Sequence, residues 1–284
     1  MPAYETIGAR FVRRVLPKRK ADTHKGDYGK LLLLCGSVGF TGAAALAAMG
    51  ALRGGAGLVY LGVPEPVYPI VAGKLLEAIV FPLPSVGGTL SREAIPEIEK
   101  RLCGVDAVLL GPGLGRSDDV SLIVQAVLKQ SGVPVVLDAD GINAICTHKD
   151  VLRECACPKI LTPHEGEFAR LSDLLLTSPR EQAALNFAKQ MRCVCVLKGH
   201  RTVISDGMRC AVNRTGNPGM ATGGSGDVLA GLLTALIGQG LSPFDAAASA
   251  VWLHGKAGDF CAAKIGQYAM LPSDLLTALP RLLP

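Results

Sequence analysis

Residues 30 to 53 read KLLLLCGSVGFTGAAALAAMGALR, and this stretch indicates the fold class. The apolar run that ends at Cys35 is typical of a strand covered on both faces. Gly36–Gly42 predicts a loop, and Ala43–Arg53 predicts a buried helix. A strand, a glycine-rich loop and a helix in this order form the repeating unit of α/β folds.

The same alternation continues along the chain and predicts a mostly parallel sheet with helices on both faces. We expect strands at 58–63, 77–81, 107–110, 134–139, 160–162 and 193–198, and a hairpin of 202–205 and 209–213. We expect helices at 92–101, 118–129, 165–175, 179–191, 226–238, 243–263 and 272–279. No internal repeat or low-complexity linker divides the chain, so the sequence predicts a single domain.

Composition narrows the class of protein. The chain has 284 residues, of which 49% are hydrophobic and 19% charged, so it can bury a sizeable core. Its net charge of +5 is mild, and no basic stripe with interleaved aromatic residues follows the N-terminal arm. This pattern argues against nucleic-acid binding. Residues 43–63 carry one charge, Arg53, but glycines interrupt them, which favours a helix, a turn and a strand over a membrane span.

The nine cysteines stand at scattered spacings. The pairs Cys155/Cys157 and Cys193/Cys195 lack the two-residue gap of zinc and redox motifs. We therefore predict reduced, mostly buried thiols. No apolar leader segment follows the basic N-terminus, so we expect a cytoplasmic protein without a membrane partner.

The strongest chemical signal is GMATGGSGD, Gly219–Asp227, which continues directly into an apolar run. A helix start presents unpaired N–H groups that attract anions, and glycine lets the backbone approach them. Asp227 is either an acid that stabilises the helix dipole or a base that takes a proton from an alcohol attacking phosphorus. We favour the base, and we expect the helix start to lower the Asp227 pKa and keep this carboxyl ionised.

Other loops at predicted strand ends are ambiguous on their own. Gly36–Gly42 and Gly111–Gly115 suit a bound ligand, but neither matches a known phosphate-binding fingerprint, and permissive turns explain them equally well. Asp138 and Asp140 are Mg²⁺ ligands or solvated acids, and from the residues alone we favour solvated acids. Lys198–Thr202 suits contact with a phosphate or ribose, or forms an ordinary turn.

The stretch TPHEGE, Thr162–Glu167, predicts a helix start. With Thr162 as N-cap, Pro163 at the first helical position and Glu165 at the third, it reads as a capping box. His164 is then not needed for capping. It either donates to a bound group or is a surface histidine.

Together these motifs resemble the ribokinase-like superfamily and, within it, the NAD(P)H-hydrate dehydratases. The matching stretches occur in the family's order and are 24–29, 36–43, 111–115, 138–141, 163–167 and 223–227. The resemblance implies a ribokinase-like α/β domain over 25–284 with a basic arm, 1–24, packed on it. It also implies a metabolite-repair lyase, which phosphorylates the 6-hydroxyl of (S)-NADHX or (S)-NADPHX with ADP or ATP and Mg²⁺. Phosphate then leaves, and NADH or NADPH is restored.

The resemblance also assigns roles to residues. Asp227 is implied as the catalytic base. The hydrated dinucleotide is expected to bind Ala43, Gly113, His164 and Asp227. The adenosine nucleotide is expected to bind Lys198, Gly199, His200, Arg201, Thr202, Gly223, Gly224, Ser225 and Gly226. No side chain is assigned as a direct metal ligand.

The same likeness suggests partners and leaves alternatives open. ADP is favoured over ATP from the His164 motif alone. We expect a separate NAD(P)H-hydrate epimerase as functional partner and a homo-oligomer, with a tetramer as the expected assembly.

One alternative is a thiazole- or pyrimidine-type small-alcohol kinase, which keeps the phosphate on its product. Another is a non-catalytic dinucleotide-binding protein, against which Asp227 and Lys198 argue. A redox dehydrogenase is disfavoured because no G-x-G-x-x-G occurs.

Overall fold

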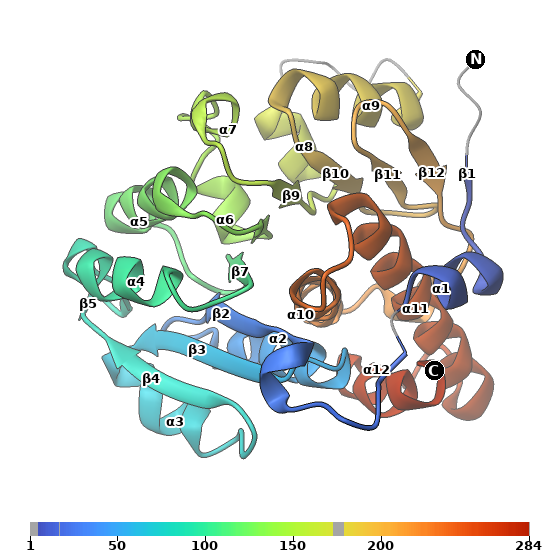
Figure 1. The fold of residues 1–284 in the computed structure, drawn as a ribbon, viewed down its shortest axis with the longest axis horizontal. Coiled ribbons are helices and arrows are strands. Elements are labelled where there is room, and N and C mark those ends of the chain that lie inside the picture. The colour runs from blue at the N-terminus through green and yellow to red at the C-terminus, as the bar shows by residue number, and fades with distance from the viewer. Residues whose placement is uncertain (1–4, 17, 173–178, 284) are drawn as a thin grey trace.

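The computed structural model describes residues 5–16, 18–172 and 179–283. Within these ranges ten strands form one sheet in the order β1-β12-β11-β10-β9-β8-β7-β2-β3-β4 (Figure 1). The strands are β1 (Glu5–Thr6), β2 (Lys30–Leu34), β3 (Leu58–Pro64), β4 (Ile79–Leu83), β7 (Ala107–Leu110), β8 (Val135–Leu137), β9 (Lys159–Leu161), β10 (Val194–Leu197), β11 (Val203–Ser205) and β12 (Cys210–Val212). A separate hairpin joins β5 (Ser85–Val86) and β6 (Thr89–Leu90).

The sheet is mostly parallel, as predicted. Its antiparallel pairs are β10–β11 and β11–β12, which include the hairpin expected around Asp206. In the N-terminal arm, β1 pairs in parallel with β12, and Val12 of the first helix is buried. The arm therefore contributes a strand to the sheet.

Helices cover both faces of the sheet (Figure 1). They are α1 (Ala9–Val15), α2 (Thr41–Arg53), α3 (Tyr68–Ala72), α4 (Ile95–Leu102), α5 (Asp118–Gln130), α6 (Asp140–Asn143), α7 (Val151–Glu154), α8 (Glu165–Leu171), α9 (Arg180–Met191), α10 (Ser225–Gly238), α11 (Pro243–Ile265) and α12 (Pro272–Ala278). Successive side chains of β2 alternate between two cores. Leu31 and Leu33 belong to the core that also contains residues of α2, α10 and α11, whereas Leu32 and Leu34 belong to the core that also contains residues of α4, α5 and α9. The two-sided cover predicted for this strand is confirmed.

Several sequence-based expectations need adjustment. The strand expected at 77–81 lies at Ile79–Leu83, and the helix expected at 165–175 ends at Leu171, while residues 173–175 lie outside the described ranges. Residues 43–63 form the rest of α2, a turn and most of β3, as expected. Within the described ranges no helix combines the length and the apolarity that a bilayer crossing needs. All nine cysteines are described and are free thiols.

Glycines set the contact between α2 and α10. A Cβ at Gly231 would lie 2.0 Å from the Ala47 carbonyl oxygen, and one at Gly50 would lie 2.5 Å from the Val228 carbonyl oxygen. The two helix backbones therefore touch, which hydrogen in place of a side chain permits. This contact fixes the position of α10, and with it the position of the helix start at Ser225.

We predict that Gly231→Ala lowers the free energy of unfolding by about 2–3 kcal/mol, because a methyl group cannot enter this backbone contact without separating the helices. Gly42→Ala is the matched control, since no atom lies within 4 Å of its would-be Cβ. We expect the control to be as stable as the wild type or slightly more stable. Urea unfolding measures both. Equal midpoints for the two variants would contradict the close packing.

Candidate active site

Adjacent parallel strands deliver the chemically interesting loops to one edge of the sheet. In the sheet order β10-β9-β8-β7-β2, these strands end just before Lys198, Thr162, Asp138, Gly111 and Cys35. The carboxyl ends of parallel strands are the usual ligand-binding edge of such sheets. The loops predicted to carry chemistry therefore meet at this edge.

The loops after β2 and β7 are joined directly. The Gly36 N–H donates to the Pro112 carbonyl at 2.8 Å, and the Ser37 hydroxyl donates to the Gly113 carbonyl at 2.8 Å. Gly113 has φ +65°, and a Cβ there would stand 2.9 Å from the Cβ of Ala43. The structure thus brings together Ala43 and Gly113, two of the residues expected to bind the dinucleotide.

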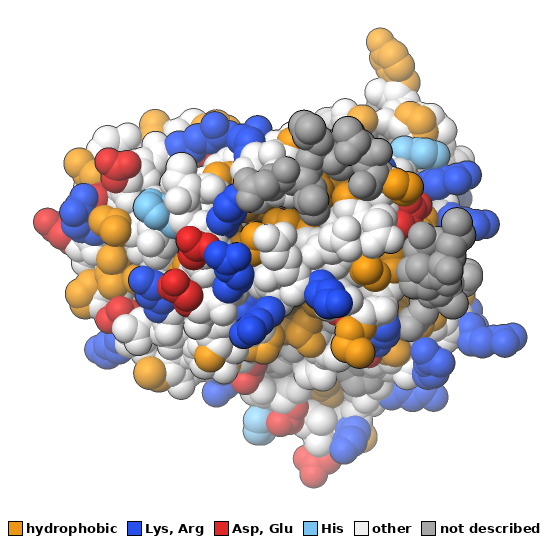
Figure 2. Space-filling view, turned by 90° about the horizontal axis from the view of Figure 1, so that it is seen from above, with side chains coloured by type: hydrophobic (Ala, Val, Ile, Leu, Met, Phe, Trp, Pro, Cys, Tyr) orange, Lys and Arg blue, Asp and Glu red, His pale blue; other side chains and the backbone are white. Residues whose placement is uncertain are grey.

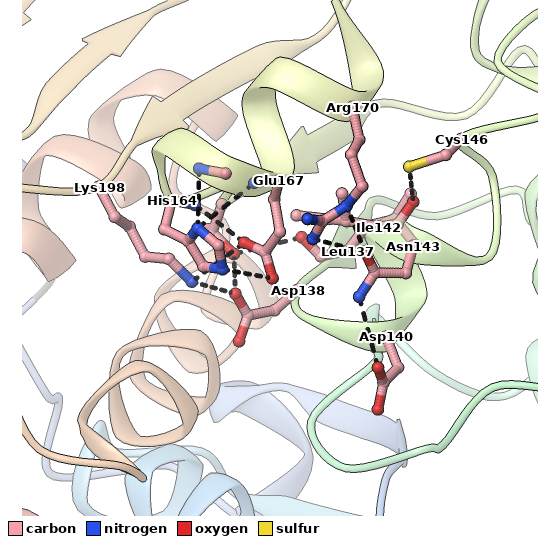
Figure 3. Close-up of polar contacts among 12 residues, drawn as sticks. Leu137, Asp138, Asp140, Ile142, Asn143, Cys146, His164, Glu167, Arg170 and Lys198 are labelled. Atoms are coloured by element: carbon pink, nitrogen blue, oxygen red, sulfur yellow. Dashed lines mark hydrogen bonds and ion pairs between the residues drawn. The ribbon is translucent and has the colours of Figure 1, made fainter.

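A partly buried ion pair lies beside these loops (Figure 3). Lys198 Nζ is 2.7 Å from Asp138 Oδ1 and 4.0 Å from Glu167 Oε2. The Thr162 hydroxyl donates to the same Asp138 oxygen at 2.6 Å. Burial opposes the charge of Lys198, but Asp138 and Glu167 outweigh it and raise the lysine pKa. Asp138 is 1% exposed, so the preferred interpretation of this residue as a solvated acid is wrong.

His164 is itself the N-cap of α8, which corrects the predicted capping box. Its Nδ1 accepts from the N–H groups of Gly166 at 3.0 Å and Glu167 at 3.3 Å. The Glu167 carboxylate in turn accepts from the His164 N–H at 2.8 Å. Thr162 does not cap the helix, because its hydroxyl binds Asp138. Since Nδ1 accepts, a neutral ring carries its proton on Nε2, which lies 3.5 Å from Glu167 Oε1 in a half-exposed side chain.

The glycine-rich stretch forms the start of α10. Gly224 is the N-cap with φ +98°, and Gly223 is exposed with no atom within 4 Å of a would-be Cβ. A Cβ at Gly226 would lie 3.5 Å from Lys198 Nζ, so the glycine stretch adjoins the ion pair. His254 of α11 contacts this helix start: its Nε2 lies 2.9 Å from the Ser225 carbonyl oxygen. Burial lowers the His254 pKa to about 4, so the ring is neutral and Nε2–H donates to that carbonyl.

The Asp227 carboxyl is partly buried in the first turn of α10. Burial raises its pKa to about 6, the negative charge of Asp138 adds to the rise, and Lys198 opposes it. The expected lowering of this pKa by the helix start is therefore wrong. Desolvation and neighbouring carboxylates outweigh the helix dipole here.

Arg180, at the first position of α9, was missed by the sequence analysis. Its guanidinium donates to the carbonyls of Leu197 at 3.1 Å, Lys198 at 2.9 Å and His200 at 2.6 Å, with a longer bond to Arg201. A Cβ at Gly199 would stand 2.7 Å from Arg180 Nη2. Arg180 thus fixes the loop that contains the expected nucleotide-binding residues 198–202, in which His200 and Arg201 are exposed. In the sequence, Pro179 and Arg180 indicate only the start of a helix. This local pattern does not predict contacts with a loop 17 to 21 residues further along the chain.

Comparison with known proteins adds an independent result. A family profile described as NAD(P)H-hydrate dehydratase matches residues 31–281. The chain is 46% identical over 283 residues to the bifunctional NAD(P)H-hydrate repair enzyme Nnr of Moorella thermoacetica, covering 98% of this chain and 53% of that protein. It is 37% identical over 275 residues to the ADP-dependent (S)-NAD(P)H-hydrate dehydratase of Bacillus subtilis, covering 95% and 94% of the two chains.

A solved structure agrees with these relatives. The crystal structure of the ADP/ATP-dependent NAD(P)H-hydrate dehydratase from Bacillus subtilis, co-crystallised with ATP/Mg²⁺, has a TM-score of 0.84 and 33% sequence identity to this chain. The match covers 98% of this chain and 97% of the Bacillus chain. The chain spans about half the length of the first curated relatives it matches, with shares of 53% and 51%.

We predict that Asp227→Asn stabilises the fold at pH 8 by about 1–2 kcal/mol, because the raised pKa means that folding desolvates an ionised carboxylate. The folded pKa of about 6 exceeds the ordinary value of 3.8, so this penalty is complete above pH 6 and disappears as the pH falls to 3.8. Urea unfolding of both proteins from pH 8 to pH 4 should show the difference shrinking. A difference that grows on acidification would contradict the assignment.

We predict that Arg180→Ala raises the Kd for ADP about tenfold or more. The loop expected to bind the nucleotide then loses the guanidinium that donates three or four hydrogen bonds to its backbone carbonyls, and its conformation is no longer fixed. Arg180→Lys should rescue little, since one ammonium cannot span them. Lys189→Ala, on the exposed side of the same helix, is the matched control for loss of a positive charge. Calorimetric titration with ADP measures all three. Unchanged ADP affinity in a folded Arg180→Ala variant would show that the loop does not need this support.

Proposed function

The chain belongs to the NAD(P)H-hydrate dehydratase family, and on this basis we propose that it converts (S)-NADHX or (S)-NADPHX to NADH or NADPH with ADP or ATP as co-substrate. The observation that carries the proposal is the carboxyl of Asp227. It stands in the first turn of α10, next to the glycine stretch and the Lys198–Asp138 pair, with its pKa raised to about 6. A base is most effective when its pKa lies near the working pH.

In the first step, Asp227 accepts the proton of the 6-hydroxyl while that oxygen attacks the terminal phosphorus of the nucleotide. The bond from this phosphorus to its bridging oxygen breaks, and the shortened nucleotide leaves with the electron pair, as AMP from ADP or as ADP from ATP. Backbone N–H groups of the glycine stretch, Gly223–Gly226, stabilise the charge on the transferred phosphoryl group. Lys198, beside Gly226, adds positive potential to the same place. His254 supports this geometry from below, because its bond to the Ser225 carbonyl fixes the first turn of α10.

In the second step, the C6–O bond breaks and phosphate leaves with its electron pair. The ring-nitrogen lone pair assists this departure, and loss of a proton from the neighbouring ring carbon restores the dihydropyridine. Phosphate is a far better leaving group than hydroxide, so the phosphorylation makes the dehydration possible. No strong acid is then required of the protein.

The residues present fit a Mg²⁺ ion that arrives with the nucleotide. Thr162 and Lys198 both bind Oδ1 of Asp138, whereas Oδ2 lies 3.9 Å from the would-be Cβ of Gly226. The described residues hold no cluster of three or more His, Cys, Asp or Glu side chains suited to a metal. Asp138 would hold such an ion together with phosphate oxygens and water, since Mg²⁺ takes oxygen ligands. Such an ion would neutralise charge on the phosphate oxygens.

The remaining assignments stay predictions. We propose dinucleotide contacts at Ala43, Gly113 and His164, and nucleotide contacts at 198–202 and 223–226. The basic arm 1–24 and the catalytic domain 25–284 stay our division of the chain. A separate epimerase as functional partner, a homotetramer and a cytoplasmic location stay predictions from the family resemblance.

We predict that the protein restores the dihydropyridine absorbance of hydrated NADH in the presence of ADP or ATP and Mg²⁺. Asp227→Asn should lower kcat about 10²–10⁴-fold, because the amide cannot accept the hydroxyl proton, with ADP affinity nearly unchanged. Wild-type turnover should fall as the pH drops through about 6, where Asp227 becomes protonated. The matched control is Asp22→Asn, which alters an exposed acid in the arm.

Product analysis separates this function from the alternatives. Free phosphate together with NADH supports the dehydratase, whereas a stable phosphorylated acceptor would identify a small-alcohol kinase. Binding of the hydrate without any nucleotide turnover would identify a dinucleotide-binding protein. Near-normal turnover by Asp227→Asn would remove Asp227 from the proposed chemistry.

A further inference from the structure

A cavity of about 570 Å³ lies beside the proposed reaction centre, between α5, α6 and the end of α8. Its volume is in the range of small-molecule sites. Its lining includes Arg116, Ser121, Leu122, Asn143, His148 and Arg170. None of the residues expected to bind the dinucleotide or the adenosine nucleotide lines it. The cavity therefore has no role in the chemistry derived so far.

Backbone and side-chain contacts connect this cavity to the reaction centre. Gly115 and Asp140 both line it, and the Gly115 N–H donates to Asp140 Oδ2 at 2.9 Å. Gly115 stands two residues beyond Gly113, and Asp140 two residues beyond Asp138. The negative charge of Asp140 also contributes to the raised pKa of Asp227, which places the two carboxyls within electrostatic reach. The cavity thus adjoins the loops of the proposed reaction site through Gly115 and Asp140.

Two arginines stand in the cavity wall. Arg170 donates through Nε and Nη2 to the Asn143 side-chain oxygen at 3.2 and 2.9 Å, a neutral partner (Figure 3). Arg116 is 70% exposed and reaches Asp140 Oδ1 through Nε at 3.4 Å. The other acid in the lining is Asp118. Within the described ranges no carboxylate pairs with Arg170, so its charge is available to a ligand.

The proposed substrate needs such cations. A dinucleotide carries negative charge on its diphosphate, yet Ala43 and Gly113 are neutral, and His164 uses Nδ1 to cap α8. Lys198 is bound to Asp138 on the side of the nucleotide loop. On the face seen in Figure 2, basic side chains occur at separate places with acidic side chains among them in the left half, so this face offers no uniform basic surface. The diphosphate therefore requires dedicated partners near the reaction centre.

Building on the proposed function, we propose that Arg116 and Arg170 bind the diphosphate of the hydrated dinucleotide and that its adenosine half occupies this cavity. Guanidinium groups bind phosphate through paired N–H donors. The side chains of Val120 and Leu122 form an apolar part of the lining, against which an adenine can pack. Those of Ser121 and Gln125 can form hydrogen bonds with the edge of the adenine or with the ribose. The two adenosine-containing substrates then lie on opposite sides of Asp227, with the co-substrate at 198–202.

The test compares Arg170→Ala and Arg116→Ala with Arg153→Ala, an arginine of α7 that does not line the cavity. We expect the KM for hydrated NADH to rise tenfold or more in each cavity variant, with kcat within about twofold and the KM for ADP unchanged, because uniform binding is lost. The control should keep wild-type KM. Leu122→Glu, which changes a side chain that is 39% exposed, should raise the same KM without threatening the fold.

A second measurement is independent of turnover. With the nucleotide site saturated by ADP, calorimetric titration with ADP-ribose should show binding to the wild type that Arg170→Ala and Leu122→Glu each weaken about tenfold or more. If ADP-ribose binds in this way but hydrated NADH is not dehydrated, the proposed function fails and the cavity assignment stands. If dehydration occurs while both variants keep wild-type KM and ADP-ribose binding, the cavity assignment is overturned and the function stands. Absence of both dehydration and ADP-ribose binding overturns both.

Discussion

The ion pair between Lys198 and the buried Asp138 organises the proposed active site. It joins the end of β10 to the end of β8, and Thr162 at the end of β9 binds the same carboxylate oxygen. Three neighbouring strands are therefore held in register at their functional edge. Buried ion pairs add little net stability, because desolvation offsets their attraction, but breaking one is costly. The pair is better understood as a device that fixes geometry than as a source of stability.

The same pair sets the electrostatics of the reaction centre. Burial is the main cause that raises the pKa of Asp227, Asp138 adds to the rise, and Lys198 limits it. Without the lysine, two carboxyls near a desolvated helix start would favour a protonated Asp227, which could not act as a base. Without Asp138, the pKa of Asp227 would rise less, because burial would act against the lysine with less support. The balance keeps the pKa of Asp227 in the range where a carboxylate is both available and able to accept a proton.

The sequence predicted the sheet and most helices, because apolar runs and glycine positions are local signals. It failed where distant residues decide the outcome. The pKa of Asp227 depends on burial and on Asp138, far away in the chain, and Arg180 acts on a loop that follows a whole helix and strand. The cap of α8 was misplaced because Thr162 and Pro163 imitate a helix start. His24 caps the short helix Lys25–Tyr28 in the same way, with Asp27 in the role of Glu167, so the pattern His-x-Gly-acid was a usable signal.

The bonds of Arg180 also give the loop after β10 a polarity. In a trans peptide unit the C=O and N–H bonds point in opposite directions. When a guanidinium draws the carbonyls of Lys198, His200 and Arg201 toward itself, the N–H groups of Gly199, Arg201 and Thr202 are turned the other way. A positive group behind the loop thus creates a row of amide hydrogens in front of it. The attraction for an anion that we propose for this segment would then be imposed by a side chain that never needs to touch the anion.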